Sequence, residues 1–234
     1  MLRVRGWDIL NNTFDFYFAL LKSTSCLIEP HYLPSLEYFC ALLRFDKLIL
    51  EKNQHYIKQS FRNRCYINTA NGVEMLVVPL SEKHGKVQLK DIRIDYTKKW
   101  QNNHWRGIQS AYAKAPFFEH YSDALKQIIF SDHQFLYDLN LALLSFCLRS
   151  MDLEKEISET VSYEKTFGGD IYDLRSAITP KEPYSGRPYY KPMAYYQVFG
   201  SAFAENLSFV DLLFSMGPGS LAILRASQKE ILNK

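Results

Sequence analysis

Two short apolar runs near the start of the chain, at residues 26–28 and 47–50, have the length of buried strands. Between them, after Pro34 and Ser35, apolar positions recur every three or four residues: Leu36, Phe39, Cys40 and Leu43. A strand, a helix and a second strand in this order predict a parallel pair joined by a crossover helix, which is the first unit of an α/β fold.

A β-hairpin is predicted next. Two strand-like runs, 56–68 and 73–80, are separated by a turn that contains Asn71 and Gly72. Both residue types accept the positive φ of a tight hairpin turn. Further on, Ile92 and Ile94 alternate with polar residues, and this alternation predicts another half-buried strand.

The middle and the end of the chain have helical periodicity. Apolar stripes predict helices over 98–114, from 122 to 130 and from 131 onward. Ser208 and Asp211 have the spacing of a capping box at the start of a C-terminal helix, which Gly217 should end before the last helix begins. Together these patterns predict an α/β fold, with a mixed β-sheet flanked by helices, a helical middle segment and C-terminal helices; an α+β arrangement is the alternative.

Domain organisation is indicated by a change of composition between Asp152 and Pro192. Charged residues, the adjacent Gly168 and Gly169, and prolines replace the apolar periodicity. The chain that follows is too short to fold alone, so this region is interpreted as an irregular excursion or lid within one domain over 25–234. Residues 1–24 are interpreted as an N-terminal extension rather than a signal peptide, because Asp15 interrupts their apolar part.

Composition narrows the function classes. The 28 basic and 25 acidic side chains leave a net charge of only +3, which argues against a nucleic-acid partner. The four cysteines have no CxxC spacing, so free thiols in the cytoplasm are the simplest interpretation. No apolar run approaches the roughly 20 residues of a transmembrane helix.

Several common catalytic motifs are absent from the sequence: GxGxxG, GxxxxGK[ST], GxSxG, HExxH and paired CxxC. Standard dinucleotide-binding, P-loop, hydrolase and zinc interpretations therefore lack support, and no metal ligands are assigned.

The segment 54–64 is the most distinctive candidate for a binding site in the sequence, because of its cations. If it is extended, Lys58, Arg62 and Arg64 lie on one face, where they would attract an anion, and arginine adds bidentate recognition of phosphate. The alternative is that these charges only protect an edge strand from pairing with another chain. The sequence leaves both interpretations open.

Three side chains are candidates for proton transfer. His31 lies in the loop after the first strand, where ligands of open α/β sheets gather. Glu29 ends that strand and would serve as a general base if it were buried near cations. His104 lies on an apolar helical face. A purely structural role is the alternative for both histidines.

Several ordered segments resemble the WbqC-like protein family. The similarity extends from about Cys26 to Leu224, and it is carried by these motifs: Pro34-x-x-x-Tyr38-Phe39; Gln54 with Lys58, Ser60, Arg62, Asn63 and Arg64; Gly72 leading to Val78-Pro79; Trp100-x-x-x-His104-Trp105-x-x-Ile108 followed by Tyr112 and Ala115-Pro116-Phe117-Phe118-Glu119; Gln197-x-Phe199; and Asn206-Leu207-Ser208-x-x-Asp211-Leu212-Leu213-Phe214 with Gly217-Pro218. The region 152–192 is shorter here than in the longer members of the family. In this respect the chain is similar to a compact subgroup found in Bacteroidetes-type bacteria.

The resemblance implies a cytoplasmic bacterial protein of surface-polysaccharide or O-antigen biosynthesis. Its first functional expectation is a transferase that attaches an acyl or aminoacyl group to the amine of a nucleotide-activated sugar. Lys58, Arg62 and Arg64 would hold phosphates, and His31 or His104 would deprotonate the attacking amine. The substrate-binding set implied by the motifs is Gln54, Lys58, Arg62, Asn63, Arg64 and Tyr112.

Other expectations stay open beside the transferase. A nucleoside triphosphate would be a cofactor if it activates the acyl donor. The protein would otherwise be a non-catalytic ligand-binding or accessory protein of the same pathway, or a nucleotide-binding protein. Its small-molecule ligand is anionic in each case, and no feature of the sequence fixes the oligomeric state. Convergence of Glu29, His31, His104 and the basic segment in one cleft would favour an enzyme.

Overall fold

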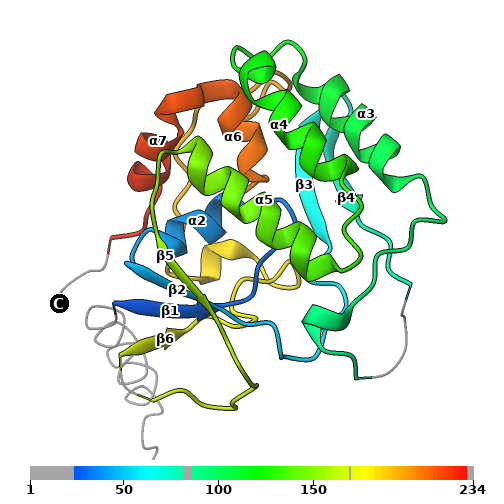
Figure 1. The fold of residues 1–234 in the computed structure, drawn as a ribbon. Helices are drawn as coiled ribbons and strands as arrows, with labels where there is room; N and C mark the ends of the chain where they lie inside the picture. The colour runs from blue at the N-terminus through cyan, green and yellow to red at the C-terminus, as the bar shows by residue number, and fades with distance from the viewer. Residues whose placement is uncertain (1–23, 82–85, 169, 231–234) are drawn as a thin grey trace, which may run out of the picture.

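The first strand, helix and strand form as the apolar pattern predicts. The computed structural model describes residues 24–81, 86–168 and 170–230 (Figure 1). Strands β1 (Ser25–Ile28) and β2 (Lys47–Leu50) pair in parallel, with Cys26 opposite Leu48, and α2 (Leu36–Leu42) connects them. The almost continuously apolar sequence of β1 suits a central strand that is covered on both faces. Most of the predicted N-terminal extension, including Asp15, lies outside the described residues.

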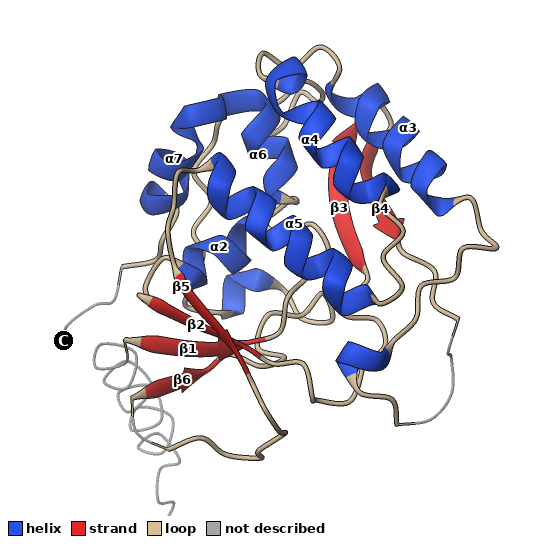
Figure 2. Ribbon diagram, viewed as in Figure 1, coloured by secondary structure: helices blue, strands red, loops and turns tan. Residues whose placement is uncertain are grey.

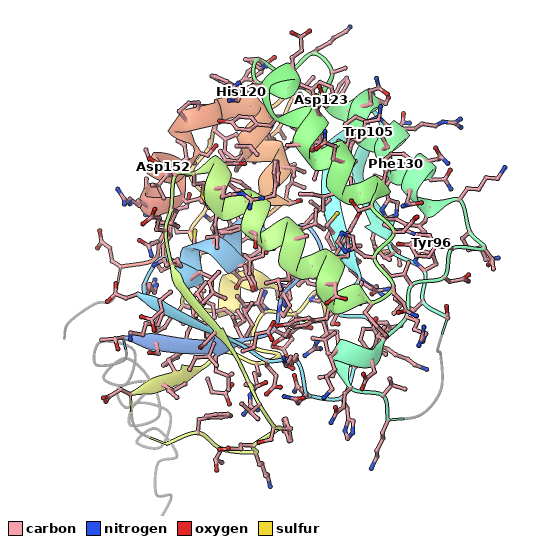
Figure 3. All side chains as sticks on the ribbon, in the orientation of Figure 1. Tyr96, Trp105, His120, Asp123, Phe130 and Asp152 are labelled. Carbon is pink, nitrogen blue, oxygen red and sulfur yellow. The ribbon has the colours of Figure 1, made fainter. Side chains whose placement is uncertain are left out.

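The predicted irregular excursion supplies both edge strands of this sheet. Strand β5 (Glu156–Glu159) pairs with β2, and β6 (Ile171–Asp173) pairs with β1, so the order is β5-β2-β1-β6 and all neighbours are parallel. Asp152 lies just after the preceding helix, from where the chain runs down to β5 (Figure 3). The region 152–192, predicted as an irregular excursion or lid, thus contains two strands of the parallel sheet.

The predicted hairpin forms a second, separate sheet. Strands β3 (Arg64–Thr69) and β4 (Gly72–Val77) are antiparallel, and Gly72 has a φ of 97° in the turn (Figure 2). Residues 54–63 are not part of β3, contrary to the extended segment considered above. The backbone turns at Gln59, which has a φ of 56°, and the N–H of Tyr32 donates to the carbonyl of Phe61 at 3.0 Å. The α/β class is confirmed, with its parallel and antiparallel strands in two sheets.

Helices cover the middle and the end of the chain, as predicted. They are α3 (Trp100–Tyr112), α4 (Phe118–Phe130), α5 (Leu136–Ser150), α6 (Phe209–Met216) and α7 (Ser220–Ala226), with short 3₁₀ turns at Leu89–Asp91, Tyr184–Gly186 and Gly217–Gly219. The labelled side chains of Trp105 and Phe130 lie with α3 and α4, away from the parallel sheet (Figure 3). The predicted strand around Ile94 is reduced to isolated bridges, one of them to Leu80.

The expected capping box at α6 does not form. Ser208 occupies the N-cap position, but its side chain makes no capping hydrogen bond among the described residues. Asp211 is instead buried, and its carboxylate accepts a 2.6 Å hydrogen bond from the hydroxyl of Tyr195. The spacing matched a cap, yet the carboxylate serves a tertiary contact to a distant loop.

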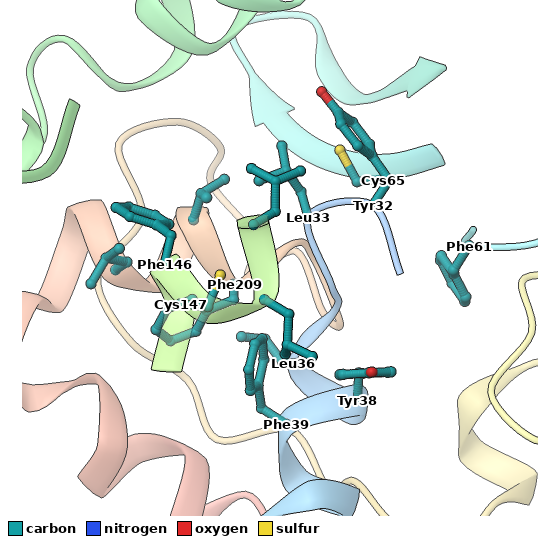
Figure 4. Close-up of a cluster of buried hydrophobic side chains, with 14 of the residues drawn as sticks. Tyr32, Leu33, Leu36, Tyr38, Phe39, Phe61, Cys65, Phe146, Cys147 and Phe209 are labelled. Carbon is teal, nitrogen blue, oxygen red and sulfur yellow. The ribbon is translucent and has the colours of Figure 1, made fainter. Parts of the chain in front are cut away.

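Part of the hydrophobic core lies between α2, α5 and α6, and the same cluster of buried side chains continues to α3 and α4. The rings of Phe39 and Phe209 pack with their centroids 4.9 Å apart (Figure 4). The stretch Phe209–Ala226 is apolar and has the length of a membrane span, but more than half of it is buried inside the fold and Gly217 interrupts it. We therefore describe it as a core segment. All four cysteines are buried free thiols.

Candidate functional site

Polar side chains gather where the four parallel strands end. Glu29 follows β1 directly and Glu51 follows β2, while Thr160 follows β5 and Arg175 lies just beyond β6. Because parallel strands end at the same edge of their sheet, these side chains come together there, which is where open α/β sheets bind ligands. Glu29 and Glu51 are both almost completely buried.

The centre of this edge is a buried cluster of Glu29, His31 and Arg62. Arg62 Nη2 lies 2.9 Å from Glu29 Oε1, and His31 Nε2 lies 3.6 Å from the same oxygen. All three residues are only 1% exposed. A carboxylate removed from water needs such a counter-charge, since an unpaired buried charge is costly.

Electrostatic interactions and burial give Glu29 and His31 different charge states. Burial alone would raise the pKa of Glu29, but the Arg62 guanidinium, His31 and the Ser176 N–H together lower it to about 2. Burial lowers the pKa of His31 below its usual value and outweighs the attraction of Glu29. The cluster at neutral pH is therefore an ionised carboxylate beside a neutral imidazole, whose Nε2 faces the carboxylate.

The two ring nitrogens of His31 differ in their surroundings. Its buried Nδ1 has no hydrogen-bond partner among the described residues. A neutral imidazole with its proton on Nε2, toward Glu29, carries a lone pair on Nδ1 and is able to accept a proton there. This combination of an orienting carboxylate and a free ring nitrogen is the arrangement of a general base.

Arg62 connects the cluster to the loop after β6. Besides Glu29, its Nη2 donates to Gln54 Oε1 at 2.8 Å and to Ser176 Oγ at 3.0 Å. The backbone N–H of Ser176 donates to the Glu29 carboxylate at 3.0 Å. Asn140 fixes the same region from α5, because its Nδ2 donates to the carbonyls of Pro30 and Arg62.

A second buried carboxylate lies at the end of the neighbouring strand. Glu51 Oε1 accepts hydrogen bonds from the N–H of Asn53 at 2.6 Å and from the hydroxyl of Thr160 at 2.9 Å. Its other oxygen pairs with Arg175 Nη1 at 3.2 Å. The Arg175 guanidinium also lies 5.1 Å from the ring centre of Tyr163, so this cation attaches the loop after β5 to the strand ends.

Sequence reasoning missed Glu51, Arg175, Ser176 and Asn140. Glu51 carried a usable signal, since it follows an apolar strand just as Glu29 does. Asn140 also carried a signal, because it is a polar residue on the apolar stripe of a predicted helix. In the structure its side chain is fully buried. Arg175 and Ser176 carried none, because the strand before them was not predicted.

A pocket of about 400 Å³ lies on the outer side of the segment that contains Arg62. Its described lining residues are Tyr56, Lys58, Gln59, Asn63, Arg64, Val77, Val78, Pro79, Leu80, Asp95 and Lys98. Lys58, Arg64 and Lys98 outnumber the single lining carboxylate, Asp95. The volume lies within the range of small-molecule sites, and the charge suits an anion. We call this hollow the cationic pocket.

The structure divides the predicted site residues between several places. Glu29, His31, Arg62 and Gln54 come together in the buried cluster, whereas Lys58, Asn63 and Arg64 line the cationic pocket. His104 and Tyr112 lie apart from the cluster. The hydroxyl of Tyr112 accepts the N–H of Asn68 at 3.1 Å, inside the core.

His104 differs from His31 because both of its ring nitrogens have partners. Nε2 lies 3.2 Å from the carbonyl of Val77, which must accept, so Nδ1 accepts the hydroxyl of Tyr32 at 2.8 Å. This histidine has no lone pair left for a substrate, although Val77 itself lines the cationic pocket. Its contacts favour a positioning role behind the pocket wall.

Acid is expected to destabilise the fold through His104. Burial lowers its pKa from 6.5 to about 4, against the opposing effect of the Val77 hydrogen bond. Because the unfolded chain then binds more protons, stability falls as the pH drops from 6.5 toward 4. Between pH 7 and pH 5 this should remove about 2 kcal/mol of unfolding free energy.

Urea unfolding at the two pH values measures this loss, and His104→Gln provides the comparison. The amide can still donate to Val77 but cannot titrate, so the variant should lose about 2 kcal/mol less than the wild type over the same interval. His31 is retained in both proteins and contributes equally to both. Identical losses would show that His104 is not the titrating group.

Comparisons with known proteins find matches to the part of the chain that contains this site. Residues 29–178 match the model of the WbqC-like protein family, a range that contains the buried cluster and the cationic pocket. The Mycobacterium tuberculosis (strain ATCC 25618 / H37Rv) protein named "Uncharacterized protein Rv1507c" is 28% identical over 146 residues, which cover 61% of this chain and 62% of that protein. The match thus spans less than two thirds of the relative's length. No solved structure gives a significant match.

Among the described residues, no group of three or more His, Cys, Asp or Glu side chains is arranged to hold a metal ion.

Proposed function

The chain belongs to the WbqC-like protein family, and on that premise we propose that it is a transferase joining an acyl or aminoacyl group to the amine of a nucleotide-activated sugar. One observation carries the proposal. The short segment 54–64 has a neutral imidazole and an ionised carboxylate on its buried side, through Arg62, and a cation-lined pocket on its outer side. A base and an anion site are thereby built on the same piece of backbone.

The cationic pocket would receive the phosphates of the nucleotide. Lys58 and Lys98 are exposed, and Arg64 is half-buried, so all three cations remain reachable from solvent. Arginine binds phosphate oxygens with paired N–H donors and lysine acts as a point charge. Asn63 is held in the pocket wall by a 2.9 Å hydrogen bond from its Nδ2 to the carbonyl of Val78.

His31 would act as the general base. The sugar amine attacks the carbonyl carbon of an activated acyl or aminoacyl donor, a C–N bond forms, and the bond to the donor's leaving group breaks. The amine proton passes to His31 Nδ1 and then to the leaving group. Glu29 stabilises the imidazolium that forms in between, as a carboxylate does beside other catalytic histidines.

A second candidate is a binding protein without catalysis, and the burial of His31 favours it. His31 is 1% exposed, and the rings of Tyr38 and Phe61 pack against it at 4.6 and 5.6 Å between centroids. A substrate reaches Nδ1 only if this cover moves. If the cover stays in place, the ion cluster is structural and the cationic pocket alone carries the function. For both candidates, cytoplasmic surface-polysaccharide biosynthesis is the pathway suggested by the family resemblance.

Loss of the pocket cations is expected to weaken binding of nucleoside diphosphates. Lys58→Gln and Arg64→Gln should each raise the Kd about tenfold, because a contact to a charged group contributes about 1.5–3 kcal/mol. Isothermal titration calorimetry with uridine, thymidine and guanosine diphosphates measures this. The matched control is Lys114→Gln, an exposed cation on the chain after α3, which should leave the Kd unchanged.

The same preparations separate the two candidates. With an amino sugar nucleotide and acyl thioester or aminoacyl adenylate donors, mass spectrometry should detect the N-acylated product. His31→Gln should lower its rate at least about a hundredfold while the diphosphate Kd stays the same. Binding without any transfer would leave the non-catalytic candidate, and absence of diphosphate binding would reject both.

A further inference from the structure

A second hollow, of about 210 Å³, lies at the far end of the same hairpin. Its walls include three aromatic rings, Phe61, Tyr66 and Tyr184, and two exposed carboxylates, Glu182 and Glu205. The hydroxyl of Tyr184 donates to the Glu205 carboxylate, which connects a ring and an acid of this wall. We call it the acidic hollow.

The charge of the acidic hollow is opposite to that of the cationic pocket. Arg187 also lines it, but its guanidinium is paired at 2.6 and 2.7 Å with the buried carboxylate of Glu37. This pairing leaves the negative charges of Glu182 and Glu205 unopposed among the described lining residues. Carboxylates beside aromatic faces suit an ammonium group, and a flat ring beside polar groups suits a sugar.

The two hollows share one face of the hairpin. Alternate residues of a strand point to the same side, so Arg64 of the cationic pocket and Tyr66 of the acidic hollow lie on the same face of β3. On β4, Val77 lines the first and Val73 the second, and Val77 pairs with Arg64. Arg64 and Tyr66 are about 7 Å apart along the strand, the length of two extended residues.

We propose that the acidic hollow is the amine subsite for the ligand whose phosphates occupy the cationic pocket. This inference rests on the proposed function, and it adds the place and the recognition of the second half of the ligand. One molecule with a diphosphate at one end and a protonated amino sugar at the other matches the two charges and the spacing between them. The ring of Phe61 lines the acidic hollow and packs on His31, so the bound ammonium lies one ring away from the candidate base, and it releases one proton to solvent before the neutral amine attacks.

The test compares ligands that differ in one group. The probes are the glucose and glucosamine conjugates of uridine, thymidine and guanosine diphosphate, together with the free diphosphates, measured by calorimetry. The wild type should bind the glucosamine conjugate about tenfold more tightly than the glucose conjugate, which has a hydroxyl in place of the ammonium. The double variant Glu182→Gln/Glu205→Gln should abolish this preference and leave the affinity for free diphosphate unchanged.

Two controls make the outcomes distinguishable. Glu119→Gln removes an exposed carboxylate of α4 and should keep the preference, whereas Lys58→Gln/Arg64→Gln should weaken every probe and keep the ratio. If no diphosphate binds, the cationic pocket and the proposed function fail. If diphosphates bind but glucosamine has no advantage, or its advantage survives the loss of both glutamates, the amine subsite alone is overturned.

Discussion

Replacing Arg62 by methionine should lower the free energy of unfolding by about 3–5 kcal/mol, the loss expected when one partner of a buried ion pair is removed. The variant leaves the carboxylate of Glu29 without its guanidinium at a position that is 1% exposed. It also removes the hydrogen bonds from Arg62 to Gln54 and Ser176. Urea denaturation at pH 7 measures the change.

Two comparisons show whether the loss comes from the pair. Adding Glu29→Gln to the Arg62→Met variant should restore part of the stability, because the uncompensated charge is then gone. Lys47 and Glu156 form an ion pair of similar length, 2.9 Å, but at the surface, so Lys47→Met should cost less than about 1 kcal/mol. Equal losses for Arg62→Met and Lys47→Met would contradict the burial of the cluster.

Gly217→Ala should cost about 2–6 kcal/mol of stability. Gly217 has a φ of 51° and a ψ of −125°, a region that side chains other than glycine rarely adopt. A Cβ at this position would lie 2.5 Å from the ring of Phe117, so the ring would have to move within a packed contact. The backbone strain and the steric overlap each contribute about 1–3 kcal/mol.

Gly219 is the matched control, two residues further along the same turn. It has an ordinary φ of −72°, and a Cβ there would meet no atom within 4 Å. Gly219→Ala should therefore change the unfolding free energy by less than about 1 kcal/mol. Thermal unfolding of both variants is the measurement. If Gly217→Ala is as harmless as Gly219→Ala, the close packing of Phe117 on this turn is refuted.

The central part of the fold was predictable because burial leaves a mark on the sequence. β1 and β2 are apolar runs since both faces of a central parallel strand are covered, and Asn71-Gly72 marks the hairpin by its turn chemistry. β5 left no such mark. All of its residues are exposed, and backbone hydrogen bonds to β2 hold it in place, so neither alternation nor an apolar run appears.

The candidate site was predictable where its residues follow predictable strands. Glu29 and His31 lie after β1, and their position at the strand end is what an open α/β sheet uses. The role of the basic segment 54–64 was predictable only in part. The alternation of Lys58, Arg62 and Arg64 with apolar residues fitted a strand, but residues 58–63 form bends and turns and β3 begins only at Arg64, so Arg62 is buried in the cluster while Lys58 and Arg64 line the cationic pocket. An irregular stretch of this kind breaks the alternation of faces, although the sequence pattern still fits a strand.

The late position of both edge strands in the chain has a consequence for synthesis on the ribosome. β1 and β2 are complete by Leu50, but their outer neighbours are not made until Glu156 and Ile171 have been added. Until then the nascent pair exposes unpaired backbone N–H and carbonyl groups on both sides, which are templates for foreign strands. We expect the growing polypeptide to depend on chaperones during this interval, far more than the finished protein does.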